Sequence, residues 1–189
     1  MKTLYLDCGM GAAGDMLTAA LLELMPDREA AVAELNAAGV PGVAYSCEAV
    51  TRCGIRGTHM SVQVNGVEES ESMHDHHHHA GHHHTGLHGI EHIVREHLHL
   101  PEQVREDVLA VYGLLAEAES HVHGMPVTEI HFHEVGTMDA LADITAVCLL
   151  LYKLSSEQII ASPVCVGGGQ VRCAHGILPV PAPATAYLL

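Results

Sequence analysis

The sequence has little positive charge and no long hydrophobic run. Only 8 of its 189 residues are Lys or Arg, against 23 Asp and Glu, and the formal net charge is −15 with histidine neutral. Because no basic cluster is present, nucleic acid and anionic membrane surfaces are excluded as partners. The longest apolar run, near residues 146–152, is much shorter than the roughly 18 residues that indicate a membrane span.

The chain also lacks an export signal and paired cysteines. The N-terminal segment MKTLYLDCG carries one positive charge, and Asp7 interrupts its apolar run, so this run is too short for the hydrophobic part of a signal peptide. None of the six cysteines forms a C-x-x-C pair, which argues against a disulfide framework or a zinc knuckle. We therefore predict a cytoplasmic protein with reduced thiols. We interpret Cys8 as a buried thiol rather than a ligand.

Histidine, in contrast, is abundant, with 18 residues. Imidazole nitrogens suit nickel, zinc and copper, and the excess of carboxylates attracts cations, so the composition indicates a metal-binding protein. The 189 residues, 48% of them hydrophobic, are enough for one sizeable core. We predict a single α/β domain over residues 1–189 with a disordered His-rich insert at about 67–89.

Hydrophobic periodicity predicts an α/β fold: a mixed sheet with flanking helices and a long flexible His-rich loop. Helices are expected at residues 15–25, 28–38, 90–98, 102–123 and 137–154, with a last one starting near 184. Strands are expected at residues 2–6, 43–50, 58–64, 129–136, 159–166 and 170–173. Pro101 before the fourth helix and Gly124 after it are typical start and stop signals.

The His-rich insert is the first candidate metal-binding element. Its recruitment histidines are His76, His77, His78, His79, His82, His83 and His84. The run is internal and contains Ala80 and Gly81, which argues against a purification tag. We interpret it as a collecting loop that binds divalent metals weakly, with an affinity that falls as the pH drops through about 6.5.

The second candidate is the segment IHFHEVG. On a strand, His131 and His133 project to one face while Phe132 turns into the core. Glu134 follows directly and is a candidate catalytic carboxylate. This grouping favours a metal site over two structural histidines, although the spacing does not identify the metal.

Asp139 and Asp143 lie four residues apart on the predicted helix that follows, and so share one face of it. With His131 and His133 they form the predicted metal-ligand set. Asp139 could instead complement the helix dipole. Asp143 lies in a strongly apolar helix, where a carboxylate needs a cation, a donor network or a metal.

The N-terminal loop matches G-x-G-x-x-G through Gly9, Gly11 and Gly14. We reject dinucleotide binding, because a helical pattern stands where a second strand should end in an acidic residue. The loop amides could still hold an anion, which makes Gly11 and Gly14 candidate cofactor-binding residues. Asp7 and Asp15 are candidate catalytic residues, and Asp15 could equally be a helix N-cap.

His175 lies between a glycine-rich turn and the alternating prolines of ILPVPAPAT. It is a candidate cofactor-binding, metal-binding or proton-transfer group. A structural histidine is the equally weighted alternative.

Four segments together resemble one protein family: DCGMGAAGDM, TRCGIRGT, IHFHEVGTMDALADI and GGGQVRCAHGILPVPAPAT. In this order they are similar to the LarC nickel-insertion family. The resemblance implies a lyase-type nickel chelatase that inserts nickel(II) into pyridinium-3,5-bisthiocarboxylic acid mononucleotide. The product is the nickel-pincer cofactor of lactate racemase, and CTP is hydrolysed in the process.

The resemblance also implies that a C-terminal region, or a separate chain, supplies CTP binding with a divalent metal. That region is missing here, so this chain is expected to contribute nickel and precursor binding. The best implied site residues are His131, His133, Glu134, Asp139, Asp143 and His175, followed by Asp7 and Asp15. A homo-oligomer is compatible with the sequence. The alternatives are a nickel storage or delivery protein without catalysis and, less favoured, a metal-dependent hydrolase.

Overall fold

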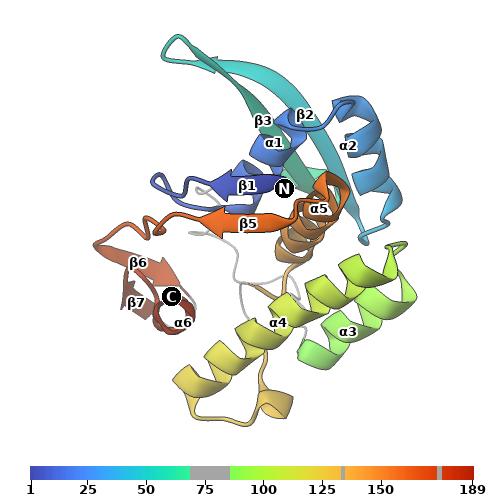
Figure 1. Ribbon diagram of the computed structural model, residues 1–189. Helices are drawn as coiled ribbons and strands as arrows, with labels where there is room; N and C mark the ends of the chain where they lie inside the picture. Colours follow the sequence, from blue (N-terminus) through green and yellow to red (C-terminus); the bar gives the residue numbers. More distant parts are fainter. Residues whose placement is uncertain (69–85, 133–134, 174–175) are drawn as a thin grey trace.

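The computed structural model describes residues 1–68, 86–132, 135–173 and 176–189. These residues form helices and small sheets (Figure 1), which confirms the mixed α/β class. Instead of one mixed sheet, the described strands lie in three sheets, with orders β1-β5, β2-β3-β4 and β6-β7. No helix within the described ranges is both long and apolar enough to cross a bilayer.

The helices follow the predicted pattern closely. They are α1 (Gly14–Glu23), α2 (Arg28–Ala37), α3 (Leu87–Glu96), α4 (Glu102–His123), α5 (Met138–Leu154) and α6 (Pro183–Leu188), with a 3-10 turn η2 at Val127–Glu129. The strands are β1 (Thr3–Leu6), β2 (Val43–Arg52), β3 (Ile55–Val64), β4 (Val67–Glu68), β5 (Gln158–Ala161), β6 (Gln170–Cys173) and β7 (Gly176–Pro179). At the two ends of the predicted insert, β4 pairs with β3 and α3 begins at Leu87.

The parallel pair β1–β5 brings the start of the chain beside residues 158–161. Leu4 aligns with Ile159, and both strands run toward the same edge. Beyond that edge, the Cys8 amide donates to Ser162 Oγ at 2.8 Å, and the Cys165 amide donates to the Cys8 carbonyl at 2.9 Å. These bonds fix the loop that leads from β1 into α1.

A long antiparallel hairpin, β2–β3, covers one side of the core (Figure 1). Its strands pair from Val43 with Val64 to Arg52 with Ile55. Cys53 and Gly54 both have positive φ at the turn, as a tight two-residue connection requires. On the outer edge of β2, the Asn36 side chain accepts a bond from the Tyr45 amide and donates one to the Tyr45 carbonyl, both at 2.9 Å.

The core lies where α1, α5 and the hairpin meet, and α4 extends it below (Figure 1). Leu22 of α1 and Leu141 and Leu150 of α5 are fully buried. Tyr112 of α4 packs on Phe132 with ring centroids 5.6 Å apart. The long apolar helix α5 therefore joins α1 and the hairpin to α4.

The prediction of a strand at residues 129–136 is wrong for the described part of that segment. The structure has the turn η2 at Val127–Glu129 and only an isolated bridge between Gly86 and His131. The Tyr112 hydroxyl of α4 donates to the Val135 carbonyl at 3.2 Å. This carbonyl is an acceptor that a neighbouring strand would need. Strands β4 and β7 were not predicted, since one is very short and the other ends in proline.

Candidate functional site

A predicted site carboxylate closely approaches the backbone where α1 meets α5, at Gly14 and Asp143. A Cβ placed on Gly14 would lie 2.4 Å from both Cγ and Oδ2 of Asp143. Such an approach is possible only for glycine, because real Cβ atoms do not come this close to other heavy atoms. Oδ1 of Asp143 is shielded from solvent. The third glycine of the N-terminal motif thus makes room for a carboxylate.

Tyr45 of β2 completes this region. It is 5% exposed, and its hydroxyl donates to the Ala142 carbonyl at 2.8 Å. Burial raises the pKa of Tyr45 far above its ordinary value, and the negative charges of Asp143 and then Asp139 raise it further. Both carboxylates therefore lie near the phenol. We call Gly14, Tyr45, Asp139 and Asp143 the α1–α5 junction.

The charge at the start of α1 favours cations over anions. The N-cap is Ala13, which provides no side-chain bond, so the alternative that Asp15 is the N-cap is wrong. Asp15 instead lies in the first turn, where its Oδ1 accepts a bond from the Met16 amide at 2.7 Å. Negative side chains suit the positive end of a helix. With Asp143 against Gly14, a further anion here would meet a negative charge at short range.

The loop before α1 is held by its own backbone. Gly11 has a φ of +100°, and its amide donates to the Cys8 carbonyl at 3.0 Å. Asp7 is exposed and accepts a bond from the Gly9 amide at 3.0 Å. Cys8 is 4% exposed, which confirms the buried thiol, whereas Cys165 is exposed. Asp7 thus lies at the carboxyl end of β1, the edge where open α/β sheets commonly bind ligands.

His131 is exposed and lies beside Gly86, whose Cβ position would be 3.8 Å from His131 Nδ1. Phe132 is fully buried, as the sequence predicted. The remaining predicted residues lie outside the described ranges: His133, Glu134, His175 and the recruitment histidines of the insert. In the described part of the chain, no group of three or more His, Cys, Asp or Glu side chains is arranged to hold a metal ion. The full predicted ligand set remains a prediction.

Two surface hollows lie on or beside the hairpin, and the second reaches the junction at Tyr45. One, of about 370 Å³, is on the hairpin, lined by Ser46, Cys47, Glu48, His59, Ser61 and Glu68. The other, of about 360 Å³, is lined by Glu29, Val32, Ala33, Asn36, Tyr45, Ser46 and Cys47. Neither includes a predicted site residue, and so the carboxylates of the junction are the better functional candidates.

Sequence reasoning missed Tyr45 and the contact between Gly14 and Asp143. The sequence indicates Gly14 only as part of a loop whose amides could hold an anion. The position of Tyr45, 97 residues before Ala142, carries no local signal for its bond to α5. Only the tertiary structure brings these groups together.

Comparison with known proteins gives a consistent assignment. Residues 4–189 match the family model described as Nickel insertion protein. Three of the similar relatives that carry the name pyridinium-3,5-bisthiocarboxylic acid mononucleotide nickel insertion protein illustrate the match. The one from Clostridium kluyveri is 41% identical over 190 residues, with 100% of this chain and 47% of the relative covered.

Those from Akkermansia muciniphila and Geobacillus kaustophilus are 40% and 38% identical, each with 100% of this chain and 45% of the relative covered. The chain thus spans just under half the length of these relatives. No solved structure matches. Because the family model covers almost every residue, the chain belongs to the nickel insertion protein family, the LarC family.

Proposed function

We propose that this chain takes part in inserting nickel(II) into pyridinium-3,5-bisthiocarboxylic acid mononucleotide, with nickel as a substrate. The single observation that supports this most is the 41% identity, over the whole chain, to a relative named for that insertion. Because the chain spans under half of that relative, its proposed share of the work is the binding of nickel and precursor. The product would be the nickel-pincer cofactor of lactate racemase.

The α1–α5 junction is the proposed place for part of this chemistry. Asp139 and Asp143 offer carboxylate oxygens to a divalent cation, and the formal charge of −15 attracts it. Oxygen and imidazole ligands hold nickel less firmly than thiolates do. Nickel bound by such groups, with His131 and His133 as further ligands, can pass to the two thiocarboxylate sulfurs of the precursor.

Insertion also forms a nickel–carbon bond on the pyridinium ring. The ring C–H bond breaks, its electron pair passes to nickel(II), and its proton goes to a base, so that no oxidant or reductant is needed. Glu134, Asp7 and Asp15 are the candidate proton acceptors, since a carboxylate within hydrogen-bond reach can act as a general base. Gly11 and His175 are the candidate contacts to the precursor, whereas Gly14, the third residue considered from the sequence, is packed against Asp143 instead.

CTP and its divalent metal would be bound by the part of the family chain that lies beyond these residues, or by a separate chain. That part would complete the enzyme. The alternative, a nickel storage or delivery protein, is favoured by the number of histidines alone, 18 in this chain.

Nickel calorimetry separates the two functions. In the full chain, the eight histidines between residues 74 and 84 are replaced by serine, which removes the recruitment histidines. We expect a stoichiometric site to survive, and its affinity to fall at least about tenfold, or 1.4 kcal/mol, in His131→Ala/His133→Ala and in Asp143→Asn. His59→Ala is the matched control and should bind as the parent does. If no site survives the serine replacements, the storage function is favoured.

A second measurement tests insertion itself. The chain is combined with the second half of a relative, precursor, nickel and CTP, and the nickel-containing product is detected by mass spectrometry. Glu134→Gln should lower product formation while leaving nickel affinity unchanged. Equal product formation by this variant would remove Glu134 from the candidate bases.

A further inference from the structure

The exposed face of α3 carries histidines outside the proposed insertion site. Ile90 and Val94 face the core, whereas His92 is exposed, and His97 is the exposed C-cap of the helix. The imidazole rings of His92 and His97 lie with centroids 5.5 Å apart and planes at 89°. Two exposed imidazoles are thus already held together at one end of this helix.

The chemistry of this pair suits a borderline divalent cation. A neutral imidazole offers one nitrogen lone pair, and it is a common ligand for nickel, zinc and copper. Because metal–nitrogen bonds are about 2.0–2.1 Å long, two imidazoles that share one ion have ring centres several ångströms apart. The observed centroid separation of 5.5 Å is of that size.

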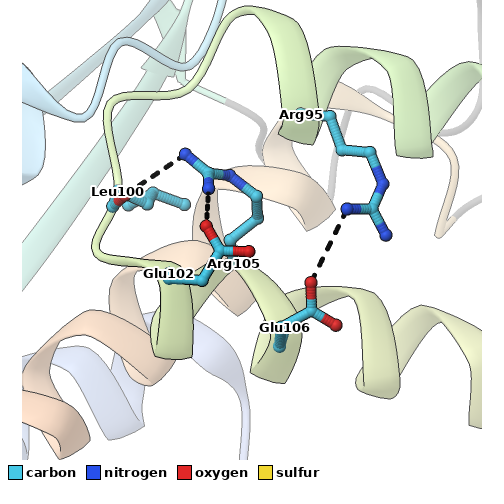
Figure 2. A network of polar contacts seen from close by, with 5 residues as sticks. All are labelled: Arg95, Leu100, Glu102, Arg105 and Glu106. Atoms are coloured by element: carbon cyan, nitrogen blue, oxygen red, sulfur yellow. Dashed lines mark hydrogen bonds and ion pairs between the residues drawn. The ribbon is translucent and has the colours of Figure 1, made fainter.

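The local electrostatics also favour a cation. The carbonyl end of a helix carries a partial negative charge, and His97 lies at that end of α3. The nearest basic side chain in the sequence, Arg95, pairs with Glu106 of α4 at 3.6 Å. Figure 2 shows it extended toward α4. Its positive charge is therefore directed to a carboxylate on another helix.

His88 does not belong to this pair. It lies one turn before His92, and its Nδ1 faces Glu91 Oε2 at 3.7 Å. Its side chain is fully exposed. His88 therefore provides a matched control: it is another exposed histidine on the same helix.

We propose that His92 and His97 chelate a divalent cation such as nickel(II), with water filling its other coordination positions. A site with two protein ligands binds weakly and exchanges readily, which suits the loading of nickel onto the protein rather than its storage. The site is separate from the α1–α5 junction, since α3 packs on α4 and α4 packs on α5. The proposal does not depend on insertion activity.

The test uses the full chain with the eight histidines between residues 74 and 84 replaced by serine. Nickel(II) binding is measured by calorimetry, and the nickel-dependent rise in melting temperature is measured in parallel, because binding to the folded state stabilises it. His92→Gln and His97→Gln should each lose one equivalent of bound nickel and reduce the rise in melting temperature. His88→Gln should change neither.

Two results would overturn the proposal. One is an unchanged stoichiometry in both His92→Gln and His97→Gln. The other is a loss in His88→Gln with His97→Gln intact, which would assign the metal to the two histidines one turn apart. Asp143→Asn, which tests the proposed insertion site, should leave the His92–His97 equivalent in place, so the two hypotheses can fail separately.

Discussion

The α1–α5 junction and the α3–α4 surface use charged side chains in opposite ways. At the junction, Asp143 packs directly against Gly14, with one oxygen shielded from solvent. On the α3–α4 surface (Figure 2), Arg95 and Glu106 pair at 3.6 Å with about half of each side chain exposed, at 51% and 53%. A carboxylate packed against backbone constrains how two helices approach, whereas an exposed ion pair contributes little to stability.

The neighbouring group in Figure 2 is intermediate between these cases. Arg105 pairs with Glu102 of its own helix, and it donates to the Leu100 carbonyl at 3.3 Å. It thus ties the connection between α3 and α4 to the first turn of α4. The contrast between the junction and the α3–α4 surface can be tested by substitutions in each of the two regions.

The largest effect is expected for Gly14→Ala. The added methyl would lie 2.4 Å from the Asp143 carboxylate and 2.5 Å from its Cβ, so α1 and α5 must move apart. We expect a loss of about 1–3 kcal/mol in the free energy of unfolding, as for other overpacked cores. Urea denaturation measures it.

The matched control is Gly113→Ala in α4, where an added Cβ meets nothing within 4 Å. Because alanine is the better helix former, this variant should gain up to about 1 kcal/mol. If Gly14→Ala is as stable as the parent, the close packing of the junction is wrong.

A smaller effect is expected for Tyr45→Phe. The substitution removes the buried bond to the Ala142 carbonyl, which costs about 1 kcal/mol at neutral pH. Because folding raises the pKa of Tyr45, the unfolded chain loses this proton first as the pH rises. The protonated phenol therefore stabilises the fold fully below its ordinary pKa of 10.0, and this contribution is lost at higher pH.

The stability of the parent chain should thus fall above about pH 10, and that of Tyr45→Phe should fall less steeply. Some slope will remain, since burial also raises the pKa of Tyr112, and burial followed by the charge of Asp107 raises that of Cys148 to about 11. Denaturation curves between neutral and alkaline pH provide the comparison. Equal slopes for the two proteins would contradict the buried position of Tyr45.

The smallest effect is expected on the α3–α4 surface. A double-mutant cycle of Arg95→Ala and Glu106→Ala should give a coupling of about 0.2–1 kcal/mol, as is usual for exposed pairs. High salt should reduce it further. A coupling above about 2 kcal/mol, or one insensitive to salt, would remove the difference between the two regions.

Local signals in the sequence predicted most elements of the fold. Helix α4 was predicted with its observed bounds because Pro101 and Gly124 mark its two ends, and Gly124 takes the left-handed conformation at the C-cap. The strand expected around His131 is absent from the described part of that segment because a strand needs a partner, and among the described residues only Gly86 bridges to it. Periodicity indicates which face of a segment is apolar, but it does not identify the neighbour.

The candidate site shows the same limit. The spacing of Asp139 and Asp143 predicts that they share one face of the helix, and the charges of both raise the pKa of Tyr45. Their position against the start of α1 depends on Gly14, more than a hundred residues earlier in the chain. Such a contact arises from the packing of two helices and leaves no pattern in either segment alone.

The bond pair between Asn36 and Tyr45 has a consequence for the behaviour of the protein in concentrated solution. β2 is the outer strand of its sheet, and a long free edge can recruit a strand from another molecule and seed aggregation. The amide group of Asn36 occupies both the N–H and the C=O of Tyr45, in the manner of a neighbouring strand. One side chain from α2 thereby blocks intermolecular pairing near the start of that edge, where an incoming strand would need continuous bonds.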